Sequence, residues 1–467
     1  MRSYLVVIIA YVLFGFFVTV ARGQSSVEIR RIEEEKRQAL ESTQISAPKD
    51  TQRLTFDYGG WIQFRYIDYE NDDNDREAQD SLDYTYSSDI RLWLKAVLAP
   101  PQDALYENRH SFYLRLKNLL VDDFPDKPEG GYDYDGPHLD YAYFIFDVRP
   151  FWLQVGRHYF SVGEGIAYSN VNDGAQILFH SRDWDLKTFV AHTLPHEDNI
   201  DTSVPGYSKS SDRFYYGLEA RSRAIPEHEF YGYLLIQRDF SNEEPEDPLQ
   251  EYTYDSQYIG LGAQGEITPQ MHYWLEVIKE GGRSRVFETN AKKDIDAWAV
   301  DLGLQYEWQV YSHPTLAIEY AYGSGDSERL SVTDTAGGNL EGKDANFLYF
   351  GYLSTGYALA PRLSNIHFYR IGASFKPFEK HTFFKNLSLG VDYYRYYKDK
   401  SAGGISDLEA TESSSDIGSE IDVTLSWQIF SDLEFTLQYG HFYPYDAYPA
   451  TTNKGEDYFS VSLTTLF

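Results

Sequence analysis

The residues of this chain whose types and spacing could do chemistry are mostly charged side chains at alternate positions. Arg91 and Lys95 alternate with leucines in one stretch, and Arg115 and Lys117 do the same in another. Because successive side chains of a β-strand point to opposite faces, each stretch predicts a strand with one charged and one apolar face. Charges on the inner wall of a pore set its selectivity, Arg and Lys for anions and Asp and Glu for cations. These residues therefore indicate a pore wall.

The alternation sorts the charged candidates into two groups that face the lumen. The basic group consists of Arg65, Arg91, Lys95, Arg115, Lys117 and Arg370. The acidic group consists of Asp301, Glu307, Glu319, Asp422 and Glu434. The charges either select ions or cross-link the wall and keep the lumen hydrated, and for a single residue the second interpretation is the simpler one. Period-two alternation places Arg157 on the same face as the apolar residues Phe151, Leu153 and Val155, so it faces the lumen only if a bulge near Gly156 shifts the register.

Motifs for catalysis or metal binding are weak. The chain has no Cys and no H-E-x-x-H, which leaves only His and carboxylates for a transition metal, and it has no G-x-S-x-G elbow. The best hydrolase-like cluster, His196-Glu197-Asp198, shows no partner at the spacing that activates a nucleophile. The acidic stretch 70–80 offers oxygens for Ca²⁺ but lacks the Gly and spacing of a Ca²⁺ loop. We therefore predict a protein that is not an enzyme and has neither a metal nor a cofactor.

The elements that must position the charged residues are amphipathic strands. We count eighteen such stretches from Leu54 onward, and nine long linkers alternate with eight short ones, such as 149–150 and 182–183. Outer-membrane barrels have an even strand number, long outer loops and short periplasmic turns. We therefore predict an all-β fold, a single transmembrane antiparallel barrel of about eighteen strands, closed by pairing the last stretch with 54–69. The stretch 346–353 is either a further strand or part of a loop, 324–364, folded into the lumen.

Composition and the N-terminus agree with an outer-membrane protein. Aromatic residues make up 17% of the chain, with 41 Tyr, which suits a barrel whose interfaces carry aromatic girdles. Residues 1–23 predict a cleaved signal peptide, with a single membrane anchor as the alternative. Residues 24–50 predict a helical or disordered periplasmic lead-in, and 51–467 the barrel. The net charge of −31 argues against nucleic acid as a partner and is explained by acidic outer loops.

Several segments resemble the alginate export family of outer-membrane barrels. QVGRHYFSVGEGIAYSNVNDGAQILF (154–179) resembles that family's Gly-Arg-Gln…Gly…Asp-Gly segment, and 416–444 is similar to its C-terminal Gly-x-Glu-Ile-Asp stretch with a Gly-x-Phe-x-Pro exit. NFLYFGYL and NIHFYRIGASFKP also fall where the family has similar segments. The resemblance implies eighteen strands and an Arg-lined, anion-selective constriction with Arg157 as its leading candidate and Glu420 and Asp422 as wall carboxylates. Two features depart from the family: His158 stands where it usually has Gln, and the net charge is strongly negative.

Two functions follow for a barrel in the bacterial outer membrane. One is outward passage of an anionic, alginate-like exopolysaccharide through a basic constriction, and the other is a general or nutrient-uptake porin for small hydrophilic or charged solutes. A hydrolase at the barrel rim is a distant third. The expected partners are the polysaccharide or solute, outer-membrane lipid and lipopolysaccharide, and periplasmic export proteins. No lipid face looks polar, which favours a monomer. The sequence leaves open the solute, its direction and whether the 324–364 loop gates the pore.

Overall fold

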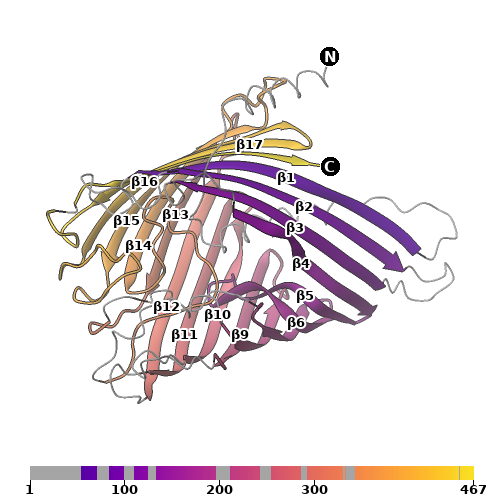
Figure 1. Ribbon diagram of the computed structural model, residues 1–467, viewed down its shortest axis with the longest axis horizontal. Helices are drawn as coiled ribbons and strands as arrows, with labels where there is room; N and C mark the ends of the chain where they lie inside the picture. The colour runs from indigo at the N-terminus through magenta and orange to yellow at the C-terminus, as the bar shows by residue number, and fades with distance from the viewer. Residues whose placement is uncertain are drawn as a thin grey trace.

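The protein is a closed β-barrel (Figure 1). The computed structural model describes residues 54–70, 84–98, 110–124, 133–195, 211–241, 254–285, 292–329, 332, 342–451 and 453–467. Within them, eighteen antiparallel strands form one sheet in which each strand pairs with the next along the chain. The predicted signal peptide and lead-in, the acidic loop after Glu70 and the 196–198 cluster lie outside the described residues.

The strand bounds are as follows: β1 Leu54–Glu70, β2 Tyr84–Leu98, β3 His110–Phe124, β4 Asp133–Val148, β5 Phe151–Val162, β6 Tyr168–His180, β7 Trp184–His192, β8 Arg213–Ser222, β9 His228–Asp239, β10 Asp255–Thr268, β11 Met271–Arg285, β12 Lys292–Glu307, β13 Thr315–Gly323, β14 Ile366–Phe375, β15 Leu387–Lys398, β16 Asp416–Phe430, β17 Leu433–Pro444 and β18 Glu456–Leu466.

The barrel closes by pairing its last strand with its first, as predicted. The β1–β18 register runs from Trp61 opposite Leu466 to Glu70 opposite Asp457, and the C-terminus lies beside β1 in Figure 1. One further pair of backbone hydrogen bonds joins Gly60 and Phe467, at 2.9 and 3.1 Å. A Cβ at Gly60 would collide with the Arg91 carbonyl oxygen and lie 2.9 Å from the Phe467 ring, so the seam requires glycine there.

The predicted faces are confirmed by burial. Leu92 is 52% exposed on the outer surface, while its neighbour Arg91 is 1% exposed on the inner side. The outer wall is apolar along much of its height, with Phe144, Ile259 and Leu261 each more than half exposed. An apolar outer band is what a barrel in lipid requires, because lipid tails offer no hydrogen bonds.

Short turns and long connections lie at opposite ends of the barrel. Arg149-Pro150 joins β4 to β5, and residues 223–227 join β8 to β9. The connections at the other end include 324–365 between β13 and β14, whose described residues form no strand of the wall. The stretch 346–353 is therefore the inward-folded loop of the two predicted alternatives. Among the described residues, no helix is long and apolar enough to cross a membrane.

Candidate functional site: the obstructed lumen

The hairpin of β5 and β6 leaves the barrel wall halfway up. β4 pairs with β5 only as far as Ala142 opposite Arg157, and β7 pairs with β6 only as far as His192 opposite Asp173. Residues 158–172, which we call the inner hairpin, lie beyond these last pairs, and their β5 and β6 arms pair with each other. Gly156 stands at the departure point with φ +126°, and a Cβ there would collide with the Ala142 carbonyl oxygen. Glycine therefore permits the bend into the lumen.

Arg157 lies at the same departure point and is bound on both sides. Its guanidinium makes two hydrogen bonds to the Asp173 carboxylate, at 2.9 and 3.0 Å, and a third to the Leu139 carbonyl oxygen at 2.9 Å. Arg157 thus keeps the register that strict alternation predicts, and no bulge turns it inward. It joins the hairpin to the edge of β4, and it is not among the residues that line the lumen cavity described below. A role for Arg157 at a constriction stays a prediction.

The tip of the inner hairpin is held by carboxylates of two other wall strands, β8 and β11. Gly163 N donates to Glu219 of β8 at 3.1 Å, and Glu164 N donates to Glu276 of β11 at 2.8 Å. Glu276 also accepts hydrogen bonds from the hydroxyls of Tyr231, at 3.0 Å, and Tyr233, at 2.6 Å. Its side chain is fully buried. A buried donor left without its acceptor costs about 1–3 kcal/mol, so these hydrogen bonds fix the tip.

A second segment, residues 344–364, also folds into the lumen, and we call it the inner loop. Leu348 N donates to Glu280 of β11 at 2.9 Å, and this carboxylate also accepts from Tyr254, at 2.6 Å, and Tyr258, at 3.1 Å. Glu280 is fully buried like Glu276. The same pattern, one backbone N–H and two tyrosines on one carboxylate, therefore occurs twice on β11.

The far end of the inner loop is held by Glu420 of β16. The backbone N–H groups of Tyr357, Ala358 and Leu359 donate to this carboxylate at 2.6, 2.8 and 3.1 Å. Tyr396 adds a hydroxyl donor at 3.2 Å. We call Glu276, Glu280 and Glu420 the carboxylate clamps. The sequence marked Glu420 as a wall carboxylate, and the structure shows it binding the inner loop.

The inner hairpin and the inner loop are bonded to each other. Phe350 N donates to Ala167 O at 3.0 Å, Ser169 N to Phe350 O at 3.4 Å, and Tyr352 N to Gly165 O at 3.0 Å. Together the two segments form one backbone-paired layer that extends from β11 to β16 inside the barrel. This layer obstructs the lumen.

The predicted basic residues on β2 and β3 meet in one cluster on the inner wall. Arg91 binds Asp89 at 2.7 Å and Asp140 at 2.9 Å, and Arg115 shares the same Asp140. The Arg115 guanidinium also lies over the rings of Trp61 and Tyr141, 5.0 and 4.0 Å from their centroids. Lys95 and Lys117 lie on the same inner face, in register with Tyr113 and Arg91. The structure therefore brings four of the six predicted cations together and adds carboxylates that partly neutralise them.

The other two predicted cations lie apart from this cluster. Arg65 donates to Ser460 Oγ of β18 at 3.4 Å. Arg370 of β14 binds Glu319 at 2.9 Å and Asp392 at 2.7 Å, which links β13, β14 and β15. For Arg370 the structure shows the cross-linking that the sequence offered as the simpler interpretation.

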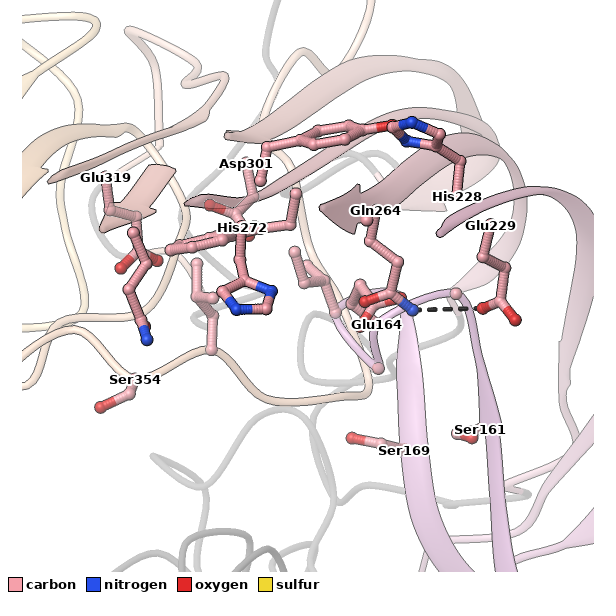
Figure 2. Close-up of a pocket in the computed structure, with 18 of the residues that line it drawn as sticks. Ser161, Glu164, Ser169, His228, Glu229, Gln264, His272, Asp301, Glu319 and Ser354 are labelled. Atoms are coloured by element: carbon pink, nitrogen blue, oxygen red, sulfur yellow. Dashed lines mark hydrogen bonds between the residues drawn. The ribbon is translucent and has the colours of Figure 1, made fainter. Parts of the chain in front are cut away.

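Below the inner segments lies a cavity of about 1080 Å³ (Figure 2). Its lining includes six carboxylates, two guanidiniums and two imidazoles: Glu164, Glu227, Glu229, Glu266, Asp301, Glu319, Arg223, Arg370, His228 and His272. In Figure 2, Asp301, His272 and Glu319 lie on one side and Glu164, Gln264 and Glu229 on the other, with Ser354 of the inner loop at its edge. This balance of charge favours cations. We call the cavity the acidic chamber.

Of the predicted acidic group, Asp301 and Glu319 line this chamber. Glu307 lies near His313 at the turn after β12, 3.1 Å away. Asp422 is buried on the inner face of β16, two residues from the Glu420 clamp. Sequence reasoning missed Glu276 and Glu280, although both stand on one face of a stretch that was predicted to be a strand. Their alternation in WLEVIKE was the available signal.

Comparisons with known proteins agree with this architecture. A family described as Alginate export matches residues 126–462, well over half of the chain. Among solved structures, Pseudomonas aeruginosa OccK8 (OprE) superposes with a TM-score of 0.54 at 13% identity, covering 88% of this chain and 98% of that one. For Pseudomonas aeruginosa OccK11 (OpdR) the TM-score is 0.53 at 12% identity, with 88% and 96% covered. These structures share the fold. No curated protein matches the chain by sequence.

Proposed function

The chain belongs to the Alginate export family, and from this membership we propose that it passes an anionic, alginate-like polysaccharide outward. It is a barrel channel of the bacterial outer membrane and acts as a transporter rather than as an enzyme. The proposal concerns what passes through the lumen, in which direction, and past which residues.

The observation that supports the proposal most directly is the cluster of guanidiniums and aromatic rings on β1–β4. Arg91 and Arg115 share one carboxylate, Asp140, and Arg115 stacks on Trp61 and Tyr141. Both guanidiniums are buried, so they act by adding positive potential to this side of the wall. The half-buried Lys95 and Lys117 can reach the carboxylate of a uronic acid sugar. We propose that the polysaccharide follows this side of the lumen, where Lys95 and Lys117 add positive charge.

The inner hairpin and inner loop determine when the polysaccharide can pass. They are bonded to each other and to the wall through the carboxylate clamps. A chain of sugars needs a continuous path, so the two segments must shift for transport. We propose that they do so as one unit, because three backbone hydrogen bonds join them.

A second candidate function is uptake of small solutes, and the acidic chamber favours it. A volume of about 1080 Å³ is that of a small-molecule site, and its surplus of carboxylates suits a cationic solute. This candidate requires no movement of a polymer through the lumen.

The reversal potential of the purified barrel in a planar bilayer under a salt gradient distinguishes the two functions. Export past the basic cluster predicts anion preference, which falls in Arg91→Gln and Lys95→Gln. Cation preference that falls in Asp301→Asn instead supports the porin and contradicts a basic path. Lys385→Gln, in the exposed turn before β15, is the control for loss of one positive charge away from the lumen.

A further inference from the structure

The outer surface of the barrel carries a second charged cavity, far from the transport path. It has a volume of about 630 Å³ and is lined by residues at one end of β9–β12 and by Lys343. Four basic side chains line it: Arg238, Arg283, Lys292 and Lys343. Their exposed fractions are 47, 69, 38 and 61%. We call these four residues the rim patch.

The rim patch keeps a positive surplus in a chain whose net charge is −31. Three carboxylates, Asp255, Asp294 and Asp296, lie among its cations. The contacts of Arg238 and Arg283 with these carboxylates are long, 3.9 Å each. Each guanidinium has five N–H donors, so the patch retains exposed donors for an anionic ligand.

Below the rim patch the outer wall becomes apolar within one row of residues. Leu234, Ile259 and Leu261 are exposed there, and Trp298 is 47% exposed. Lys279 Nζ lies 4.5 Å from the centre of the Trp298 ring, on the boundary between the two regions. Trp residues mark the level at which acyl chains meet headgroups. The patch therefore stands at headgroup height, directly above a surface for acyl chains.

The patch faces the outer leaflet. The turns at the opposite ends of these strands are short, residues 223–227 between β8 and β9 and 269–270 between β10 and β11. Short turns are periplasmic and long loops extracellular in such barrels, so the patch lies at the extracellular end. The outer leaflet of a bacterial outer membrane is built of a phosphorylated glycolipid, lipopolysaccharide.

We propose that the rim patch is a binding site for the phosphorylated headgroup of lipopolysaccharide. The guanidiniums and ammonium groups bind its phosphates through charge-assisted hydrogen bonds, and its acyl chains cover Ile259, Leu261 and Trp298 below. The site orients the glycolipid beside β9–β12. It is independent of what the channel transports.

The proposal is tested with the full mature chain in detergent, titrated with bisphosphorylated lipid A and followed by native mass spectrometry. The probe is compared with a dephosphorylated lipid A that has the same acyl chains. The wild-type chain should bind the phosphorylated form at least about tenfold more tightly, since one charge-assisted hydrogen bond alone changes affinity by that order. The variant R238Q/R283Q/K292Q/K343Q should lose this preference.

A matched control removes four cations at the periplasmic end: R149Q/R182Q/K380Q/K385Q. It should keep the wild-type preference for the phosphorylated lipid. If the quadruple rim variant does not fold, R283Q/K343Q removes the two most exposed cations and should lose part of the preference. Equal binding of the two lipids by the wild type, or an unchanged preference in the folded rim variant, overturns the proposal. The ionic selectivity of the channel should be the same in the rim variant and the wild type. A failure of the lipid-binding proposal can therefore be distinguished from a failure of the transport proposal.

Discussion

Glu276 and Glu280 stand four residues apart on β11, face the lumen together, and each bind a backbone N–H of a different inserted segment. One strand of the wall thus holds both the inner hairpin and the inner loop. The two tyrosines that bind Glu276 lie on β9. The two that bind Glu280 are Tyr258 of β10 and Tyr254, the residue before that strand. The position of the obstruction is therefore determined by side chains far from it in sequence.

Replacing the β11 clamps should loosen the inner segments. Glu276→Gln and Glu280→Gln keep the shape but replace one acceptor oxygen by an amide NH2. Each change leaves a buried donor without its acceptor, which costs about 1–3 kcal/mol. We expect the double variant to open more often, with open-state events in planar bilayers rising by roughly tenfold or more. Glu266→Gln, which lines the acidic chamber and makes no clamp, is the matched control. Identical gating in wild type and double variant would show that the clamps do not hold the segments.

Gly156 should not tolerate a side chain. Gly156→Ala places a methyl group against the Ala142 carbonyl oxygen at a φ of +126°, which costs on the order of 1–3 kcal/mol. We expect a lower midpoint of thermal unfolding, measured by the loss of the compact band in heat-modifiability gels. Gly390→Ala is the control, because its nearest neighbour lies 3.9 Å from the added Cβ. Equal losses in the two variants would argue against a special role for the bend.

Arg157 and Asp173 should behave as a structural pair. Asp173 is 47% exposed and Arg157 19%, so solvent screens the pair and its contribution is about 1 kcal/mol or less. We expect Arg157→Gln and Asp173→Asn each to lower stability slightly, and the double variant to lose less than their sum. The reversal potential should stay near that of the wild type. A clear loss of anion selectivity in Arg157→Gln would instead place this residue at the constriction, as the family resemblance implies.

Asp399, in the connection after β15, gives a prediction about pH. Partial burial works against its charge, but hydrogen bonds from His367, Lys400 and the Gly325 N–H prevail and hold the pKa of its carboxyl well below the usual range. A depressed folded-state pKa contributes stability that is full above the unfolded value of about 3.9 and is lost as pH falls toward the folded value. Hydrogen exchange at Gly325 should be slower in wild type than in Asp399→Asn at pH 6. This difference should shrink below about pH 4, and a difference independent of pH would contradict the assignment.

The sequence predicted the wall well because the wall follows local rules. Period-two alternation gave the faces of strands such as 84–98, and the alternation of long and short linkers gave the strand number and the closure of β18 on β1. Both signals are contained within each strand and its neighbours, so no long-range contact is needed to recognise them.

The interior was harder to predict because its contacts join distant residues. Glu164 and Glu276 are 112 positions apart, and nothing local indicates that the hairpin reaches β11. Asp140, which neutralises Arg91 and Arg115, was not a candidate because it sits at an irregularity in the β3–β4 register. Alternation alone would place Asp140 on the outer face with Phe144 and Phe146.

The central claim, that an anionic polysaccharide passes through this lumen, is tested most directly by ionic current in the presence of uronic acid oligomers. Oligomers of increasing length are added to the periplasmic side of a planar bilayer that holds the full mature chain, and uncharged oligosaccharides of equal length serve as the control. The proposed function predicts transient blocks by the acidic oligomers, with dwell times that lengthen with chain length and shorten in the double clamp variant. Equal blocks by neutral sugars, or dwell times independent of length, would contradict it.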